Sequence, residues 1–389
     1  MSDAALDGKS VVPSSAELIS RAEALIPLLR ANGSLADQLG RLPDENVKAV
    51  EEAGLLRMLM PEKRGGYGTD AATAAAVTTH IASGCPATAW VMSIYSGIGR
   101  MAESLPEETL AEVYAANPDA KIAGTFGSAG AVCEAVDGGV RIRGRGHWPF
   151  NSGCHHADWD LLRVSVEEPD GTTSDAFCLI PLSELTIADD WHVMGAAGTG
   201  SNSVECGELF IPERRVSRRI ADAFAALRVG DSGYAFTASL PLGMARYALE
   251  AFHDLASGRG IRMLGYEKMY DSAIVQTAVA VAHTNVKMIE SYQHWVLSTL
   301  QPGAERITDP MLTGAGGTAA YKLAREAIER LFEVCPTDEI RLDRPIQRLF
   351  RDLVAFTHQG AMSPYMNWER YGRHLVGASG PTGILPPGR

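Results

Sequence analysis

The stretch from Gly144 to Trp159 gathers the side chains of this sequence that could do chemistry. Its letters, G-R-G-H-W-P-F-N-S-G-C-H-H-A-D-W, include aromatic rings, imidazoles, a hydroxyl and an amide. Strand-like sequence before and after the stretch predicts that these side chains lie at a bend between two strands. A bend can bring polar groups together on a ligand, and a packed sheet corner with exposed histidines is the alternative.

Two further segments combine small residues with hydroxyl groups, and they lie at 123–130 and 191–203. Consecutive small residues let backbone amides approach a ligand closely. Thr125, Thr199 and Ser201 add hydroxyl groups there. A simple turn before a hairpin, or a bulged corner without a ligand, has the same composition, so the position of each segment in the fold must decide.

The last candidate for chemistry is His358, which follows the run P-I-Q-R-L-F-R-D at 345–352. An imidazole with a pKa near ~6.5 exchanges protons readily at neutral pH. No carboxylate occurs between Asp352 and Glu369, so this region offers no carboxylate base for removing a proton from carbon. A single histidine on a helix is more often structural than catalytic.

The elements that must position these groups follow from hydrophobic periodicity, which predicts an α+β fold in three domains. We expect an N-terminal helical domain at 1–115, a central β domain at 116–222 and a C-terminal four-helix bundle at 223–389. The bundle helices are expected at 234–258, 266–300, 312–333 and 345–376.

Smaller signals refine this outline. Ser14 begins a capping sequence for the first helix. Asp-Gly pairs at 137–138 and 170–171 predict two hairpins. The alanine-rich helices expected at 71–83 and 87–101 should pack closely against their neighbours.

Composition excludes several classes of function. The 389 residues carry a net charge of −12, which argues against binding to nucleic acid or to an anionic membrane surface. Six scattered cysteines without a C-x-x-C pair predict neither disulfides nor a metal site. Without a signal sequence or a long apolar run, the chain is expected in the cytoplasm.

Several motifs together resemble one family. The pattern W-x-F-N-S-G-x-x-H-A-D-W at 148–159 resembles the W-I-T-N-G segment of the acyl-CoA dehydrogenases, in the form carried by their flavin-dependent monooxygenase relatives. The segment at 191–201 resembles the W-x-x-x-G-x-x-G-T-G-S of those monooxygenases, and P-x-x-R-x-x-R-D resembles the helix before their active-site corner. The resemblance covers most of the chain. It implies the architecture of helices, β domain and bundle, assembled as a homotetramer.

The resemblance also implies roles for individual residues. Ser152 would hydrogen-bond flavin N5, and Trp148 with Phe150 would wall the flavin ring. His358 would take the proton of a phenol-like or indole-like substrate. The implied flavin-contacting residues are Thr125, Phe126, Trp148, Phe150, Asn151, Ser152, Thr199 and Ser201.

The function implied by the resemblance is that of the oxygenase component of a two-component monooxygenase. It would hydroxylate a small aromatic molecule (a phenol, an indole or a polycycle) with O₂ through a flavin C4a-hydroperoxide. No dinucleotide-binding or phosphate-binding glycine motif is present, so a separate NAD(P)H:flavin reductase would supply diffusible reduced FMN or FAD.

Two departures from the family pattern leave questions open. The stretch Arg262–Tyr266 lacks the Phe-Gly of the family's R-x-x-F-G loop, which favours FMN or loosely held FAD. After Ala89-Trp90-Val91, related hydroxylases often carry a histidine where this chain has Tyr95 and Ser96, so a second catalytic histidine is in question.

Three alternative functions remain. They are an acyl-CoA dehydrogenase with a relocated base, a monooxygenase acting on nitrogen or sulfur, and an inert flavin carrier. The missing carboxylate argues against the first of these.

Overall fold

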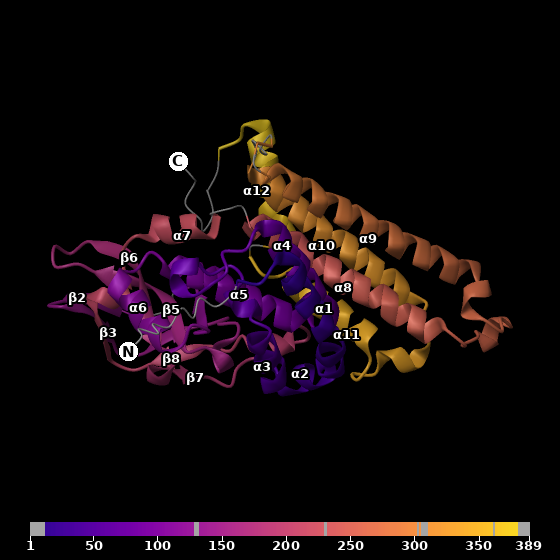
Figure 1. Cartoon of the computed structure of the whole chain (residues 1–389), viewed down its shortest axis with the longest axis horizontal. Helices are drawn as coiled ribbons and strands as arrows, with labels where there is room; N and C mark the ends of the chain where they lie inside the picture. Colours follow the sequence, from indigo (N-terminus) through magenta and orange to yellow (C-terminus); the bar gives the residue numbers. More distant parts are fainter. Residues whose placement is uncertain are drawn as a thin grey trace, which may run out of the picture.

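Helices, a β region and a helical bundle follow one another along the chain in the computed structural model, which describes residues 12–127, 132–228, 232–301, 303–304, 310–360 and 362–379. The β region lies at one end of the molecule and the bundle at the other, with the N-terminal helices between them (Figure 1). The predicted α+β fold is confirmed.

Six α-helices form the N-terminal region from residue 12 onward, where the structure describes it. They are α1 (Ser15–Ala31), α2 (Gly33–Leu39), α3 (Asp44–Glu52), α4 (Ala71–Gly84), α5 (Pro86–Ala102) and α6 (Glu107–Ala116), with 3-10 turns η1 (Leu55–Arg57) and η2 (Glu62–Arg64). The predicted cap is confirmed, because the Ser14 side chain accepts a hydrogen bond from the Glu17 N–H.

Ten strands form two sheets in the described residues of the middle region. The strands are β1 (Ile122–Thr125), β2 (Val132–Val136), β3 (Gly139–Arg143), β4 (Gly146–Trp148), β5 (Trp159–Glu167), β6 (Thr173–Pro181), β7 (Thr186–Ile187), β8 (Val204–Cys206), β9 (Leu209–Pro212) and β10 (Val216–Ser217). Four 3-10 turns lie among them, η3 (Cys154–His156), η4 (Leu182–Glu184), η5 (Ala197–Thr199) and η6 (Glu213–Arg215). The larger sheet has the order β10-β6-β5-β2-β3-β9, with β1 also paired to β5, and the smaller has the order β4-β8-β7.

Both predicted hairpins are present. Strand β2 pairs antiparallel with β3, and β5 with β6. Gly138 and Gly171 turn the two hairpins with φ of 79° and 81°, in the left-handed region that favours glycine.

The C-terminal region is helical. It contains α7 (Ile220–Arg228), α8 (Ser232–Ala256), α9 (Ala273–Thr299), α10 (Pro310–Glu333), α11 (Pro345–Phe356) and α12 (Pro364–Val376), with 3-10 turns η8 (Arg262–Leu264), η9 (Met269–Asp271) and η10 (Thr337–Ile340). Helix α7 spans the domain limit predicted at residue 222, and the domain limits stay a proposal.

Two bundle helices differ from the prediction. The run 345–376, expected as one helix, is divided into α11 and α12 by a turn that holds His358. Pro364 begins α12, and proline lacks an N–H and disfavours helical backbone in the residue before it, so the helical ladder cannot pass through this point. The helix expected from residue 266 starts instead at Ala273, after turn η9.

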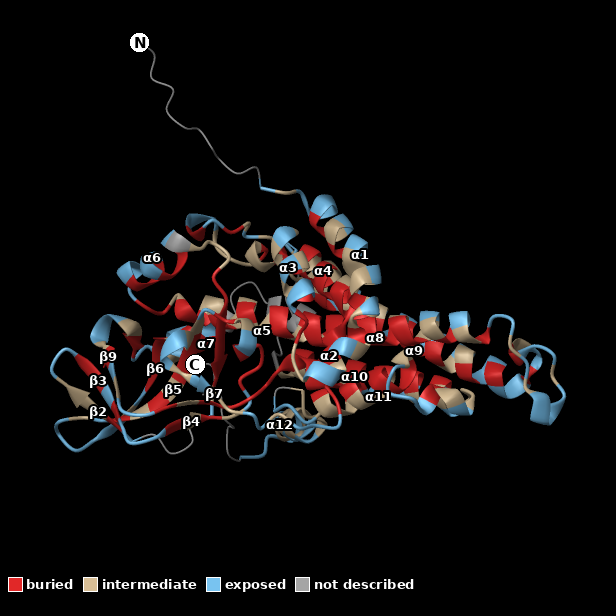
Figure 2. Cartoon of the chain, turned by 90° about the horizontal axis from the view of Figure 1, so that it is seen from below, coloured by how far each residue is buried: buried red, intermediate tan, exposed pale blue. Residues whose placement is uncertain are grey.

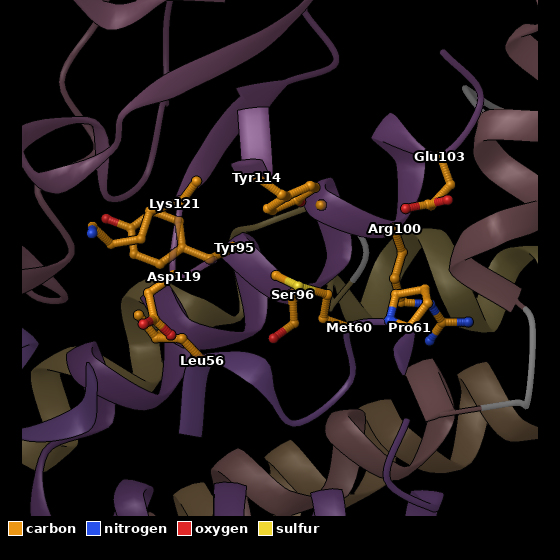
Figure 3. A pocket seen from close by; sticks show the side chains of 12 residues that line it. Leu56, Met60, Pro61, Tyr95, Ser96, Arg100, Glu103, Tyr114, Asp119 and Lys121 are labelled. Atoms are coloured by element: carbon orange, nitrogen blue, oxygen red, sulfur yellow. The ribbon is translucent and has the colours of Figure 1, made fainter. Parts of the chain in front are cut away.

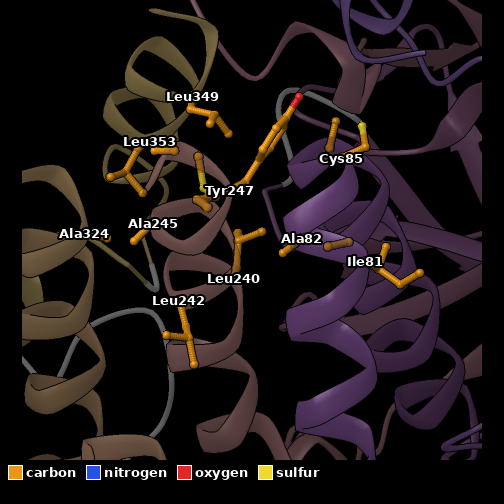
Figure 4. Packing of buried hydrophobic residues seen from close by; sticks show 14 of the residues in the cluster. Ile81, Ala82, Cys85, Leu240, Leu242, Ala245, Tyr247, Ala324, Leu349 and Leu353 are labelled. Atoms are coloured by element: carbon orange, nitrogen blue, oxygen red, sulfur yellow. The ribbon is translucent and has the colours of Figure 1, made fainter. Parts of the chain in front are cut away.

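The largest part of the core joins the N-terminal helices to the bundle. Buried residues concentrate where α4, α5 and α8 meet (Figure 2). The expected close packing of α4 is confirmed, because a Cβ on Gly243 of α8 would collide with Ala82 of α4. Tyr247 of α8 and Leu349 of α11 pack in the same cluster (Figure 4). Helix α11 is therefore anchored against the N-terminal helices as well as the bundle.

None of the helices in the described residues combines the length and the apolar sequence that a membrane crossing needs.

Candidate active site

The bend predicted between two strands lies at 149–153, between β4 and η3, and its backbone is tightly held. The Asn151 N–H donates to the Asn202 carbonyl over 3.1 Å, and the Gly153 N–H donates to the Thr199 carbonyl over 2.9 Å. Gly153 has a φ of 82°, and a Cβ there would collide with Val91 and Tyr95. The bend and the 199–202 segment thus form one corner, packed on α5.

Three of the predicted hydroxyl groups meet at this corner. The Ser152 Oγ lies 2.7 Å from the Ser201 Oγ, which lies 2.7 Å from the Thr199 Oγ1. The Thr199 hydroxyl donates to the Ala196 carbonyl over 2.7 Å. All three hydroxyl residues are buried. Segments some fifty residues apart in the sequence therefore share one chain of hydrogen bonds.

Sequence reasoning missed Trp90, which joins this corner to α11. Its indole Nε1 donates to the Ser152 Oγ over 3.1 Å. Its ring stacks on Phe356 near the end of α11, with ring centroids 4.9 Å apart. Trp90 belongs to the A-W-V motif of the sequence. The sequence prediction considered only the histidine expected after this motif and gave the tryptophan no role. Tyr95, the residue found in that region, donates its hydroxyl to the Gly153 carbonyl over 2.6 Å.

The end of the R-x-x-R-D run holds the neighbouring loop. The Asp352 Oδ1 accepts a hydrogen bond from the Ala196 N–H over 2.7 Å, and the Arg351 guanidinium donates to the Met194 carbonyl over 2.7 Å. Gly195 touches α11 so closely that a Cβ would overlap the Arg351 carbonyl. Burial raises the pKa of Asp352 to about 6, while the hydrogen bond from Ala196 acts in the opposite direction. The motif therefore fixes the loop that leads to Thr199.

His358 is exposed and lies in the turn directly after α11. Its Nδ1 is 3.0 Å from the Val354 carbonyl oxygen. A carbonyl can only accept, so Nδ1 carries the ring proton in this hydrogen bond and Nε2 of the neutral ring has the free lone pair. Such an imidazole can accept a proton from a substrate at Nε2.

Two of the predicted aromatic residues differ in position from the expectation. Trp148 is 0 % exposed in the β core, and its indole donates to the Arg163 carbonyl over 2.9 Å, so its ring has no face available to a ligand. Phe150, in contrast, is 71 % exposed. Its φ of 62° is rare for a residue other than glycine, and its ring meets the edge of Trp191 at a centroid distance of 6.3 Å. The ligand wall is therefore to be sought at Phe150 and Trp191 rather than at Trp148.

The 123–130 segment lies at the end of β1, and residues 128–131 fall outside the described residues. The Thr125 hydroxyl is buried and donates to the Pro149 carbonyl over 3.1 Å, which ties β1 to the bend. Phe126 packs against Phe177 and Phe224, with centroid distances of 6.3 and 5.5 Å. The ring of Phe126 thus belongs to a packed aromatic cluster.

Asn151 of the bend and Asp160 of β5 form a buried hydrogen-bonded pair. The Asn151 amide donates to the Asp160 Oδ2 over 2.6 Å, and both side chains are 0 % exposed. The other oxygen of each side chain has no hydrogen-bond partner in the described part of the chain. Burial raises the pKa of Asp160 to about 8, so at neutral pH this carboxyl keeps a proton that it can donate. Asn151 was predicted at the site, whereas Asp160 was not.

A small cavity lies beside α5, lined among others by Met60, Tyr95, Ser96, Tyr114 and Lys121 (Figure 3). Its volume of about 30 Å³ suits one or two water molecules rather than an aromatic ring. The described residues also contain no cluster of histidine, cysteine and carboxylate side chains that could hold a metal ion. The hydroxyl corner and the His358 turn therefore remain the candidate site.

Comparison with known proteins shows relatives along nearly the whole chain. Residues 30–108 match the acyl-CoA dehydrogenase N-terminal domain, and residues 235–363 match the acyl-CoA dehydrogenase C-terminal domain. The chain is 28 % identical to the oxygenase component of an FADH(2)-dependent resorcinol hydroxylase from Rhizobium sp. (strain MTP-10005), over 96 % of this chain and 95 % of that protein.

A second relative is the flavin-dependent monooxygenase oxygenase subunit HsaA of Mycobacterium tuberculosis (strain ATCC 25618 / H37Rv), 28 % identical over 94 % of each chain. Among solved structures, XiaF from Streptomyces sp., in complex with FADH2 and glycerol, superposes with a TM-score of 0.83 at 25 % identity, over 96 % of this chain and 97 % of that chain. The chain belongs to the acyl-CoA dehydrogenase superfamily, in its branch of flavin-dependent monooxygenases. The family predicted from the sequence motifs is confirmed.

Proposed function

We propose that this chain is the oxygenase component of a two-component system that hydroxylates a small aromatic molecule with reduced flavin and O₂. The observation that carries the proposal is a buried Ser152 hydroxyl in the same bend as the exposed Phe150. The relatives of the chain are oxygenase components, and they align with it over nearly the whole length of both chains. The absence of a carboxylate between Asp352 and Glu369 supports this function over that of an acyl-CoA dehydrogenase.

The residues at the corner fit a flavin. Phe150 and Trp191 offer an apolar surface for the ring, and Ser152 retains a lone pair beyond its two partners among the described residues. The loop that contains Thr199 and Ser201 would lie at the edge of the same ligand. Bound reduced flavin would supply the electrons and activate O₂, while the protein would exclude water around it.

His358 is proposed as the general base. Its Nε2 would take the proton of a phenol hydroxyl or an indole N–H, which raises the electron density of the ring carbon to be hydroxylated. A positioned acid–base group contributes ~10²–10⁴-fold to the rate of such a step. We propose a phenol as the substrate class, because the resorcinol hydroxylase relative acts on a phenol by its name.

A separate flavin reductase and a homotetramer complete the proposal. Support for assembly comes from large apolar side chains exposed on two bundle helices, namely Ile274, Met288 and Trp295 of α9 and Tyr365 and Trp368 of α12. All six cysteines are free thiols, which supports a reducing compartment such as the cytoplasm.

The test uses the purified chain, reduced FMN or FAD prepared anaerobically, and a panel of phenols and indoles. On addition of O₂ we expect a hydroxylated product from at least one member of the panel, counted per flavin oxidised. Oxidation of the flavin without any hydroxylated product would contradict the proposal. Bleaching of a tightly bound oxidised flavin by an acyl-CoA would instead establish the dehydrogenase.

A further inference from the structure

Four hydrogen bonds run in series through the corner. They connect the Trp90 indole to Ser152, Ser152 to Ser201, Ser201 to Thr199, and Thr199 to the Ala196 carbonyl, with lengths of 3.1, 2.7, 2.7 and 2.7 Å. The series begins at a group that can only donate, because an indole N–H has no acceptor atom, and it ends at a carbonyl that can only accept. We call this series the hydroxyl relay.

The two ends determine the direction of every bond between them. Each hydroxyl has one proton. The proton of Thr199 goes to the Ala196 carbonyl, so the bond between Ser201 and Thr199 uses the proton of Ser201. The bond between Ser152 and Ser201 must then use the proton of Ser152. All four bonds are made together in this one arrangement only.

The consequence for Ser152 is that it turns no proton toward a ligand. Its proton points to Ser201 and one lone pair accepts from Trp90, which leaves the second lone pair. The residue therefore meets a ligand as an acceptor. Ser152 can donate to a ligand only by breaking its bond to Ser201, which leaves a buried acceptor unsatisfied.

This polarity distinguishes the two redox states of a flavin. Atom N5 of oxidised flavin is an acceptor without hydrogen, whereas N5 of reduced flavin carries a hydrogen and donates. We propose that Trp90, Ser201 and Thr199 are positioning residues that hold Ser152 as an acceptor, so that the site selects reduced over oxidised flavin. This inference rests on the proposed function and deepens it. It gives an oxygenase a means to release the spent cofactor.

The experiment measures dissociation constants rather than turnover. Oxidised FMN and FAD are titrated by fluorescence, and the reduced forms are titrated under argon. Thr199→Val removes the hydroxyl that accepts the hydrogen bond from Ser201, at nearly constant side-chain volume. Ser201 can then donate to Ser152, and Ser152 can donate to N5. We expect the ratio of the oxidised to the reduced dissociation constant to fall by ~10-fold in this variant. Ser201→Ala should lower the ratio similarly, and Thr199→Ser, which restores the hydroxyl, should keep the wild-type ratio.

A modified flavin isolates the N5 contact. Oxidised 5-deaza-FMN has a C–H where oxidised FMN has the N5 lone pair, and it is otherwise similar in shape. Wild-type protein should therefore bind oxidised 5-deaza-FMN more tightly than oxidised FMN, and Thr199→Val should remove the difference. A general loosening of the corner would weaken both ligands equally. Thermal melting of each variant checks that it folds. If Thr199→Val does not fold, Ser201→Ala provides the same test.

The outcomes separate this inference from the function on which it rests. The relay is supported if the wild type binds reduced flavin selectively and both Thr199→Val and Ser201→Ala lose this selectivity. Equal affinity for the two redox states in the wild type, or selectivity that both variants retain, overturns the relay and leaves the proposed function standing. Failure of every flavin to bind the wild type overturns both.

Discussion

The corner around Ser152 and the turn around His358 are built differently. Ser152 is buried, has two side-chain partners, and lies in a bend held by backbone hydrogen bonds on both sides. His358 is exposed, and its ring donates a hydrogen bond to the Val354 carbonyl near the end of the preceding helix. Trp90 donates its N–H to Ser152, and its ring stacks on Phe356, which precedes His358 by two residues in the chain.

The difference suggests two modes of binding within the proposed site. Groups that are already ordered lose little entropy when a ligand arrives, which suits a flavin that must be captured from solution in each cycle. An exposed imidazole can adjust to the substrate that contacts it. Substitutions at the corner should therefore change flavin binding and coupling, whereas a substitution at the turn should change substrate oxidation alone.

The largest effect is expected at the turn. His358→Ala should lower the rate of aromatic hydroxylation by ~10²–10⁴-fold, because the substrate proton loses its acceptor, while the flavin dissociation constant stays at its wild-type value. Product per reduced flavin, measured by chromatography, checks the first part, and anaerobic titration checks the second. His283→Ala, at an exposed histidine on α9, is the matched control. Equal product yield in the His358 variant would refute its role as base.

A smaller effect is expected where α11 holds the flavin loop. Asp352→Ala leaves the buried Ala196 N–H without its acceptor, at a cost of about 1–3 kcal/mol. We expect weaker binding of reduced flavin and a lower melting temperature, whereas Asp352→Asn keeps an oxygen at the same place and should retain most of the affinity. Wild-type flavin affinity in Asp352→Ala would show that the loop holds its shape without α11.

At the centre of the corner, Ser152→Ala should uncouple oxygen use from hydroxylation. Without the hydroxyl, flavin N5 loses its acceptor, and we expect more hydrogen peroxide and less product for each reduced flavin consumed, by ~10-fold in their ratio. Peroxide and product are measured in the same reaction. Ser165→Ala, at a half-buried serine of β5 that hydrogen-bonds Asp175, serves as control. A wild-type ratio would exclude Ser152 from the flavin contact.

The smallest effect concerns the pH dependence of stability at Asp160, the partner of Asn151 in the bend. Burial raises the pKa of Asp160 from 3.8 to about 8. Between these values the unfolded chain has lost the proton and the folded chain keeps it, so stability falls as pH rises through this window and changes no further above it. Asp160→Asn keeps a donor toward Asn151 and cannot ionise. The melting temperature of Asp160→Asn minus that of the wild type should therefore increase by a few degrees (~2–4 °C) as pH rises from 5 to 9.

The control for this pH series is Asp175→Asn, at a partly exposed carboxylate on β6. A melting difference between wild type and Asp160→Asn that is the same at every pH would mean that Asp160 does not change its charge in the window.

Local signals in the sequence predicted local structure well. Asp-Gly pairs indicated both hairpins because a turn with positive φ requires such residues. The division of 345–376 into two helices was missed because apolar periodicity continues on both sides of the turn. Pro364 indicated a break in the helix, but the periodicity was given more weight. Trp148 was misjudged because a sequence does not say which face of a strand a side chain occupies when both faces are covered.

The site was predicted in part. Ser152, Thr199 and Ser201 came from motif resemblance, and the structure places them in mutual contact. Trp90 and Asp160 were not found, because their roles depend on contacts with Ser152 and Asn151 that exist only after distant segments have packed. A hydroxyl motif indicates which groups are present, but the proton direction depends on what lies at each end of the series.

The bond between Asp352 and Ala196 also bears on the order of events during synthesis. It joins residues 156 positions apart, so the loop beside Thr199 leaves the ribosome long before the carboxylate that holds it. A nascent chain halted after the last β-strand has all the corner hydroxyls but no α11 to fix their neighbouring loop. The loop beside Thr199 therefore gains its hold on α11 only after 156 further residues have been synthesised.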